Sequence, residues 1–246
     1  MSWHREPLVG FDLETTGTEP LEARIVTAAV VTVGDGTGEP VGARAWLADP
    51  GIRIPAQASA IHGISSERAA AEGRPVAEVA DEVADTLVAH WRDGVPVVAY
   101  NAAFDLTLLS AELRRHGLPS LRDRLGGAGI GPVIDPYTVD RAVDRYRKGK
   151  RNLEAVCTEY GVVHGGAHDA SADALAAVRV AYAIAGRHPA VAALTAAELH
   201  ERQITWYAEW AADFQAFLRR KGSADAVVDG DWPLRRVVVE PSDARV

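Results

Sequence analysis

The chain has 246 residues and a net charge of −8, with 48% hydrophobic and 24% charged residues. This composition is ordinary for a packed soluble protein and excludes disorder over the whole length. No uncharged apolar run of about 18 residues is present and the first residues are polar and charged, so we expect neither a membrane span nor a secretory signal. The acidic charge disfavours wrapping of long duplex nucleic acid, so action on nucleic acid would be local and would need metal ions to supply positive charge.

The predicted elements begin with a group of strands and then alternate between strands and helices. Three short β-rich stretches predict an antiparallel meander, with a glycine-rich turn at 34–38 between the second and the third. Further along, apolar residues recur at helical spacing between short apolar stretches. This order predicts an α/β fold with a mixed five-stranded sheet flanked by helices over residues 1–186. The expected strands are 8–13, 24–33, 40–47, 95–99 and 133–135, the expected helices are 76–91, 102–116, 137–146, 153–160 and 170–185, and 50–57 is expected to be a loop.

Residues 187–246 differ in pattern and are predicted to form a C-terminal extension. Four aromatic residues within 190–222 are spaced by four, four and three positions, which places them on one stripe of a helix; they are Trp206, Trp210, Phe214 and Phe217. A valine-rich stretch at 237–239 would add a short strand or a tail. Because aromatic stripes usually pack into cores, we expect this helix to pack on the main domain, and a docking surface for a partner protein is the alternative.

Two carboxylates, Asp12 and Glu14, stand at the end of the first predicted strand. Alternate residues of a strand point to the same face, so the two side chains are expected side by side, with Gly10 leaving room on that face. Like charges about 4 Å apart repel by about 4 kcal/mol at an effective dielectric constant near 20. A divalent cation is the usual compensation. The alternative is a pair of solvated acids before a turn.

A third acid, Asp105, falls in the first turn of the helix that follows the strand 95–99. Strand-to-helix junctions are where open sheets build their sites, and such a junction would bring Asp105 toward Asp12. The alternative is that the carboxylate only interacts favourably with the helix dipole, at roughly 0.3–1 kcal/mol.

A histidine-containing loop precedes the long alanine-rich helix. Asp173 falls in the first turn of that helix, and His168 lies five residues before it. His164 and Asp169 have the same offset, so spacing alone does not choose between the histidines; the position of Asp173 on the helix favours His168. The alternative is that Asp169 or Ser171 caps the helix and His168 is a surface residue.

With these motifs in this order, the chain resembles the DEDDh family of 3′→5′ exonucleases in the ribonuclease-H-like superfamily and is similar to the epsilon proofreading subunit of bacterial DNA polymerase III. The resemblance covers roughly residues 7–186 and is carried by four segments: Phe-Asp-Leu-Glu-Thr-Thr-Gly at 11–17, Ile-His-Gly-Ile-Ser at 61–65, Asn-Ala-Ala-Phe-Asp at 101–105 and His-Asp-Ala-Ser-Ala-Asp-Ala at 168–174. It implies a ribonuclease-H-like sheet and two Mg²⁺ or Mn²⁺ ions. It also implies four catalytic carboxylates that hold the metal, Asp12, Glu14, Asp105 and Asp173, with His168 as the general base.

Contacts to the substrate are less sharply indicated. The resemblance and the position of the turn after the first strand suggest that the 3′ nucleotide meets Thr15, Thr16, Ile61, His62, Asn101 and Phe104. Asn101 could instead fix its own loop, and Phe104 could belong to the core. A basic run could grip phosphates upstream of the cut or form a solvated loop; it comprises Arg141, Arg145, Arg147, Lys148, Lys150 and Arg151.

The expected function is metal-dependent hydrolysis of phosphodiester bonds at the 3′ end of single-stranded or frayed DNA, in proofreading or repair. The alternatives are an exonuclease for RNA 3′ ends and a non-catalytic module that docks on nucleic acid or on a polymerase. The expected partner is a nucleic acid 3′ end, with DNA favoured over RNA, and a stand-alone enzyme is favoured over one bound to a DNA polymerase. The single Cys157 excludes an internal disulfide and agrees with the expected cytoplasmic location.

Overall fold

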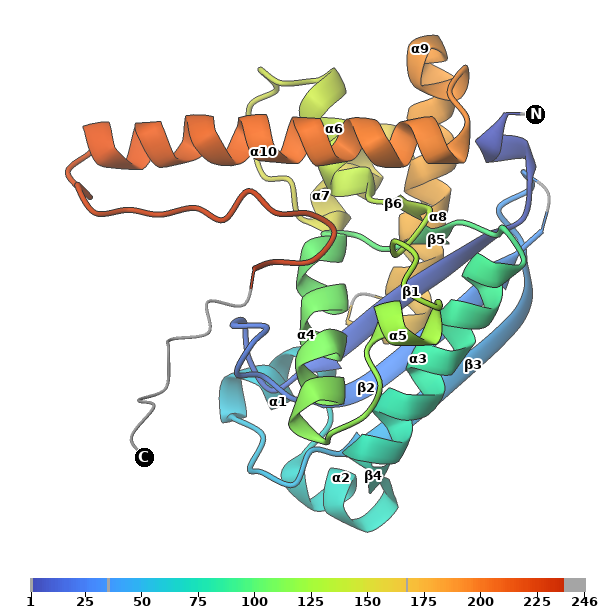
Figure 1. Ribbon diagram of the computed structural model, residues 1–246, viewed down its shortest axis with the longest axis vertical. Helices are drawn as coiled ribbons and strands as arrows, with labels where there is room; N and C mark the ends of the chain where they lie inside the picture. Colours follow the sequence, from blue (N-terminus) through green and yellow to red (C-terminus); the bar gives the residue numbers. More distant parts are fainter. Residues whose placement is uncertain (1, 35, 167, 237–246) are drawn as a thin grey trace.

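The computed structural model describes residues 2–34, 36–166 and 168–236 (Figure 1). A 3₁₀ turn at Trp3–Arg5 precedes the first strand. The strands are β1 (Leu8–Thr15), β2 (Ile25–Val33), β3 (Pro40–Asp49), β4 (Arg74–Pro75), β5 (Val97–Val98) and β6 (Val133–Ile134). The helices are α1 (Ala56–His62), α2 (Ser66–Glu72), α3 (Val76–Arg92), α4 (Ala102–Arg115), α5 (Leu121–Arg124), α6 (Pro136–Val143), α7 (Leu153–Tyr160), α8 (Ala170–Arg187), α9 (Pro189–Ala192) and α10 (Ala196–Arg220).

The strands form one mixed sheet in the order β4-β3-β2-β1-β5-β6. β1, β2 and β3 make the expected antiparallel meander, β5 and β6 run parallel to β1, and β4 runs parallel to β3. The predicted α/β fold with helices around a mixed sheet is confirmed. The sheet has six strands where five were expected, because β4 is a two-residue pairing with Ala48 and Asp49 that is too short to leave a periodic pattern.

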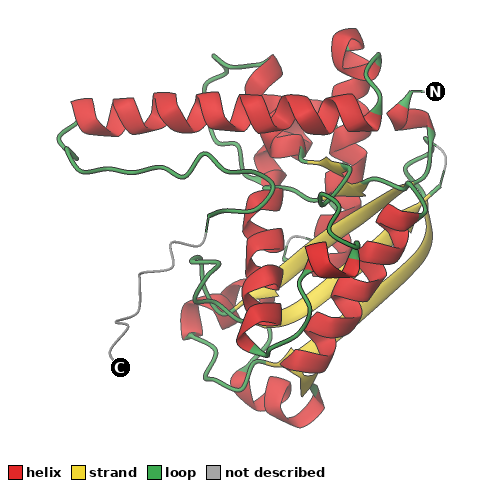
Figure 2. Ribbon diagram, in the orientation of Figure 1, coloured by secondary structure: helices red, strands yellow, loops and turns green. Residues whose placement is uncertain are grey.

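Helices cover both faces of the sheet, as Figure 2 shows. Successive residues of β1 alternate between the two faces. Val9, Phe11 and Leu13 join the core beneath α3 and α4, while Leu8 joins the core beneath α8. The even-numbered residues of β1 therefore face α8, and the side chains that lie beyond Leu8 on this face belong to the candidate site.

Some helix limits differ from the sequence predictions. Gly186 was expected to stop the long alanine-rich helix, yet α8 includes it and continues to Arg187. The stop is made by Pro189, which disfavours helical geometry at the preceding residue. Residues 50–57 were expected to be a loop, but α1 begins within this range at Ala56. The described helices also include α2, α5 and α9, which are short and escaped the periodicity criterion.

The long helix α10 crosses the end of the sheet and contacts α6 and β6 (Figure 1). Its buried Gln203 amide donates to the Val133 carbonyl at 2.9 Å and accepts from the Asp135 N–H at 2.6 Å. The segment after α10 runs back along the helix (Figure 1), and its Trp232 is buried. The valine stretch 237–239 lies outside the described residues. None of the helices in the described part of the chain combines the length and the apolar character needed to cross a membrane.

Candidate active site

Two of the predicted carboxylates, Asp12 and Glu14, lie on the α8 face of β1 at its carboxyl end. Gly10 precedes them on the same face, and a methyl group in its place would collide with the carbonyl oxygen of Ala174. Because only a glycine allows this contact, the first turn of α8 lies directly against β1. That turn carries Asp173, which is thereby brought to Asp12 and Glu14.

Asp105 reaches the same strand from the other side. It lies in the first turn of α4, is 4% exposed, and its Oδ1 accepts a hydrogen bond from the Leu13 N–H at 3.2 Å. Leu13 separates Asp12 from Glu14, so this bond ties the Asp105 carboxylate to the backbone between them. The structure thus brings together the four carboxylates that the sequence singled out.

The proximity of these acids has a marked electrostatic effect. Burial raises the pKa of Asp12 well above its ordinary value, and the charges of Asp105, Asp173 and Glu14 raise it further. Burial also raises the pKa of Asp105, against hydrogen bonds that lower it. The pKa of Glu14 rises to about 7, first through burial and then through the charges of Asp173 and Asp169. Such a cluster is held ionised at neutral pH only if positive charge enters it.

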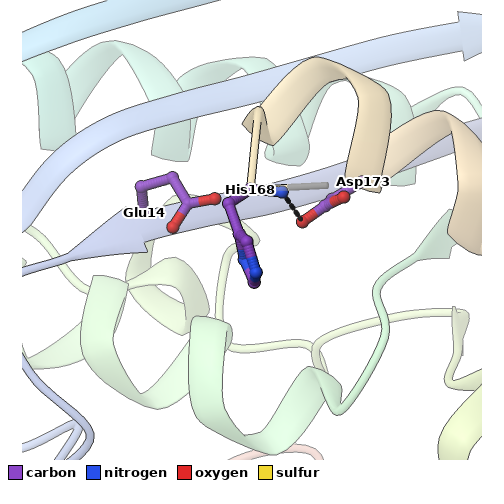
Figure 3. Close-up of side chains that lie close together, drawn as sticks. All are labelled: Glu14, His168 and Asp173. Atoms are coloured by element: carbon purple, nitrogen blue, oxygen red, sulfur yellow. Dashed lines mark hydrogen bonds between the residues drawn. The ribbon is translucent and has the colours of Figure 1, made fainter. Parts of the chain in front are cut away.

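The predicted general base, His168, lies in the loop before α8 with an exposed side chain. Its backbone has a φ of 67°, in the left-handed region that few non-glycine residues adopt. Its N–H donates to Asp173 Oδ2 at 3.2 Å (Figure 3). Potential ligand atoms of Glu14, His168 and Asp173 lie within 4.8 Å of one another. Asp169 caps α8 by accepting hydrogen bonds from the N–H groups of Ser171 and Ala172. The alternative interpretation of this loop, in which Asp169 caps the helix, is therefore correct for Asp169, and His168 nevertheless lies at the site.

A second histidine also contacts the cluster. The Nε2 of His164 forms a short contact with Asp173 Oδ1, whereas the backbone N–H of His168 donates to the other carboxylate oxygen, Oδ2. The sequence favoured His168 over His164, because His164 lies among glycines. No local pattern indicates that the loop of His164 folds back onto α8. Both histidines therefore lie beside Asp173, and their roles can be separated by experiment.

The donor set fits a hard divalent cation. It consists of carboxylate oxygens from three different elements. Burial is the main cause of the raised pKa values of Asp12 and Glu14, and the neighbouring carboxylate charges, which a cation would offset, add to it. Oxygen donors of this kind suit Mg²⁺ or Mn²⁺, and the described side chains that lie close enough to share a cation include no cysteine. Burial and the charge of Asp173 raise the pKa of the Cys157 thiol to about 11, so it is not a thiolate at neutral pH.

A pocket of about 450 Å³ opens beside these groups and is lined by Glu14, His62, His168 and Trp46, among others. His62 is the last residue of α1; burial lowers its pKa, and the charge of His168 lowers it further. The neighbouring Ile61 is 56% exposed and does not line this pocket. Among the proposed substrate contacts, His62 thus lies at the pocket and Ile61 lies outside its wall.

The turn after β1 is held by its own hydrogen bonds. The hydroxyl of Thr15 donates to the Gly17 carbonyl at 2.7 Å, and the hydroxyl of the buried Thr16 accepts from the Arg24 N–H at 2.9 Å. Both side chains therefore shape the turn.

Asn101 and Phe104 precede Asp105 at the start of α4. Asn101 caps this helix in the left-handed region, with a φ of 65°, and its side chain lines a groove beside Tyr100 and Tyr137. Phe104 is partly buried against the core beneath α3 and α4, which is the position expected of a core residue.

Asp135 was not predicted as a site residue from the sequence, yet it holds the Asn101 backbone in place. The fully buried Asp135 carboxylate accepts from the N–H of Asn101 at 2.8 Å, from the N–H of Tyr137 at 3.0 Å and from the Thr138 hydroxyl at 2.8 Å. The indole of Trp232 donates to it at 3.4 Å. An Asp-Pro pair directly after a strand is a common start of a helix, and this signal could have marked Asp135 as a cap.

A mixed sheet of this kind, with four carboxylates from β1, α4 and α8 meeting beside its first strand, is typical of nucleases. A family model described as exonuclease, of the RNase T type, matches residues 9–181. The chain therefore belongs to this exonuclease family, which confirms the expected class, a DEDD-type 3′→5′ exonuclease enzyme of the ribonuclease-H-like superfamily.

Individual relatives agree with this membership. The chain is 28% identical over 175 residues to a PolC-type DNA polymerase III of Streptococcus thermophilus, and the match covers 71% of this chain and 11% of that protein. The PolC-type polymerase of Lacticaseibacillus paracasei is 26% identical over 72% of this chain and 11% of its own length. The chain thus spans about a tenth of these relatives.

Solved structures of exonuclease I have the same fold. The Escherichia coli enzyme in complex with a dA16 oligonucleotide aligns with a TM-score of 0.62 at 22% identity, over 76% of this chain and 42% of that one. Exonuclease I of Methylocaldum szegediense aligns with a TM-score of 0.60 at 25% identity, over 76% and 42% of the two chains.

The raised pKa of Glu14 predicts how metal-free stability depends on pH. Its folded-state pKa of about 7 lies above the ordinary 4.5, so the folded state binds the proton more tightly and loses stability as the pH rises from about 4.5 to 7. With solvent screening allowed for, we expect this loss to be about 1–2 kcal/mol at pH 8. In chelator at pH 8, Glu14→Gln should therefore melt about 2–8 °C above the wild type.

The matched control is Glu22→Gln, which changes an exposed acid outside the cluster. Thermal melts at pH 4 and pH 8 in chelator measure both variants. At pH 4 the advantage of Glu14→Gln should vanish because Glu14 is then protonated in both states. An advantage that is equal at both pH values would contradict the electrostatic origin.

Proposed function

We propose that the chain removes nucleotides from the 3′ ends of single-stranded or frayed DNA by hydrolysing the terminal phosphodiester bond. The observation that carries this proposal is the meeting of Asp12, Glu14, Asp105 and Asp173 at the end of β1, with His168 beside Glu14 and Asp173. We place the enzyme in the cytoplasm and its role in proofreading or repair.

The four carboxylates would hold two divalent cations, Mg²⁺ or Mn²⁺. When bound, such ions neutralise the phosphate, lower the pKa of the attacking water and stabilise the leaving oxygen. Asp12, Glu14 and Asp173 would hold the site next to the attacking water, and Asp12 and Asp105 would hold the second site. His168 accepts the proton of the water as it attacks phosphorus, and its exposed position allows the proton to pass to solvent.

The remaining groups would position the terminal nucleotide. His62 lines the pocket beside Glu14 and His168. Thr15 and Thr16 would contact the nucleotide from the turn that follows β1, where the Thr16 N–H is bonded to the Arg24 carbonyl at 3.0 Å. Ile61, exposed on α1, would contact the nucleotide from the rim. Asn101 and Phe104 would approach it from the start of α4.

The identity of the polymer is supported by the relatives. Exonuclease I structures were solved with dA16 and dT13 oligonucleotides, and the sequence relatives are PolC-type DNA polymerases. These names favour DNA over RNA as substrate. The polymerase relatives also keep open an association with a DNA polymerase, while a stand-alone enzyme remains our preferred form.

A time course on end-labelled substrates tests this function directly. We expect 3′-labelled single-stranded DNA to release labelled mononucleotide first, while 5′-labelled DNA shortens in single-nucleotide steps. Chelator should stop both reactions and Mg²⁺ should restore them. Faster digestion of an RNA of the same sequence would show that RNA is the preferred substrate. The absence of hydrolysis with both polymers and both metals would refute the proposal that the chain is an exonuclease.

A further inference from the structure

A groove of about 440 Å³ lies between α6 and α10, away from the carboxylate cluster. Its walls combine arginines with the aromatic stripe of α10. The lining includes Arg141, Arg145, Arg151, Trp206, Trp210 and Phe214, together with the acids Glu209 and Asp213. Positive groups interleaved with exposed rings are the combination that binds single-stranded nucleic acid, because phosphates meet the cations and bases stack on the rings.

Arg141 is the cation that this groove leaves unpaired. Its guanidinium lies 4.0 Å from the ring centre of Trp210 and 4.2 Å from that of Tyr137. Among the described residues no carboxylate forms an ion pair with it, and its Nη1 is buried without a hydrogen-bond partner. Burial lowers the pKa of Arg141 without discharging a group of such high ordinary value.

The other arginines of the basic run have structural partners. Arg145 pairs with Asp213 across the groove, and Arg147 and Arg151 both pair with the buried Asp140. Part of this run therefore holds the loop after α6 in place. Because Asp213 is already neutralised by Arg145, Glu209 is the acid left to oppose an incoming phosphate.

A second groove joins the first to the start of α4. It shares Arg141 and Arg151, adds the exposed Lys150, and reaches Tyr100 and Asn101. Asn101 caps the helix whose first turn carries Asp105. The two grooves therefore adjoin at Arg141 and Arg151, and together they extend from the start of α4 to α10.

The aromatic stripe of α10 is open along its outer half. The rings of Trp210 and Phe214 lie 5.6 Å apart at 14°, and those of Phe214 and Phe217 lie 6.3 Å apart at 14°. Phe214 is 39% exposed and Phe217 is 44% exposed.

The segment that follows α10 covers a different side of the helix. Gly230 packs on Ala208 and Ala211, and the Val228 N–H donates to Gln215. At about 100° per residue, these three positions lie more than a quarter turn from the mean direction of the aromatic stripe. The segment at 222–236 therefore leaves the stripe facing the groove and the solvent, as far as the described residues extend.

We propose that these two grooves form one track that binds the strand upstream of the 3′ end, with phosphates at Arg141 and Lys150 and bases stacked along Trp210, Phe214 and Phe217. This proposal rests on the proposed function for the direction in which the strand runs. The occupant is single-stranded DNA, whose phosphates complement the unpaired cations in a chain that is otherwise acidic. The aromatic side of the track belongs to the extension after residue 186, beyond the part matched by the family model, whereas its cations, Arg141 and Lys150, lie within the matched part.

The test compares a long and a short substrate. Three changes alter the track: Arg141→Gln, Lys150→Gln and the pair Phe214→Ser with Phe217→Ser. We expect each to raise the KM for a 20-residue oligothymidylate about tenfold, the size of one lost base-stacking or phosphate contact. Hydrolysis of a thymidine 5′-phosphate p-nitrophenyl ester, which occupies only the terminal pocket, should keep its kcat and KM. The matched controls Arg5→Gln and Val41→Ser change exposed residues outside both grooves.

Direct binding separates this proposal from the proposed function. The anisotropy of fluorescein-labelled oligothymidylate, measured in chelator, should show weaker binding by the track variants than by the wild type and the controls, whether or not the protein hydrolyses DNA. Equal binding by all folded variants would overturn the track. Lys150→Gln alters an exposed side chain, so it remains a valid test if the aromatic changes disturb folding.

Discussion

Asp12→Ala is expected to lower hydrolysis of single-stranded DNA by at least about 10³-fold at saturating Mg²⁺, the scale of losing a main electrostatic contribution to the transition state. Asp12 is the member of the cluster whose pKa is raised by all three other carboxylates, so it lies at their centre. Its removal would deprive both cation positions of a shared ligand. Initial rates with 3′-labelled DNA measure the effect.

The same variant should remain folded. The Asp12 side chain makes no hydrogen bond to a described residue, and its charge is repelled by its neighbours. Its loss should therefore leave the melting temperature in chelator equal to or above that of the wild type. Asp225→Asn, an exposed acid in the segment after α10, is the matched control and should keep full activity. Substantial residual hydrolysis by Asp12→Ala would show that the catalytic centre lies elsewhere.

Local patterns and a family resemblance together predicted the carboxylate cluster. The alternation of β1 placed Asp12 and Glu14 on one face, and helix starts placed Asp105 and Asp173 in first turns. The general rules of open sheets brought Asp105 toward Asp12, and the resemblance to the exonuclease family added Asp173 to the same site. The close contact between β1 and α8 at Gly10 makes this meeting possible. The sequence predicted only that Gly10 leaves free space on that face of the strand.

Contacts between distant segments could not be read in the same way. Asp135 forms hydrogen bonds with Gln203 and Trp232, which are 68 and 97 residues away in the sequence. None of the three belongs to a periodic pattern from which its contact partner could be predicted. His164 was left aside because the fold of a glycine-rich loop depends on what it packs against. The two-residue strand β4 is defined only by its pairing with β3, so its own sequence does not predict it.

These long-range contacts link the extension to the catalytic helix. Gln203 of α10 and Trp232 of the following segment both bond Asp135, which in turn holds the Asn101 N–H at the start of α4. The Arg235 N–H also donates to the Thr107 hydroxyl of α4 at 2.9 Å. The extension thus supports the helix that carries Asp105 while its outer aromatic face remains open. One segment can therefore serve both to position a catalytic carboxylate and to bind the strand that leads to it.

The two histidines beside Asp173 should respond differently to substitution. His168→Ala is expected to lower kcat by about 10²–10⁴-fold at saturating Mg²⁺, the usual contribution of a general base. His164 contacts Asp173 Oδ1 and would orient that carboxylate toward the cation. His164→Ala should therefore raise the Mg²⁺ concentration needed for half-maximal rate by about 10–100-fold, the usual effect of losing a partner of a metal ligand, while kcat at saturating Mg²⁺ stays near that of the wild type.

The pH profile provides the second readout for this pair. A general base must be neutral, and an ordinary imidazole loses its proton near pH 6.5, so the wild-type rate at saturating metal should rise between pH 6 and pH 8. His164→Ala should keep this rise, and His168→Ala should lose it. If the flat profile and the low kcat appeared in His164→Ala instead, His164 would be the base, and the left-handed backbone at His168 would serve only to aim its N–H at Asp173.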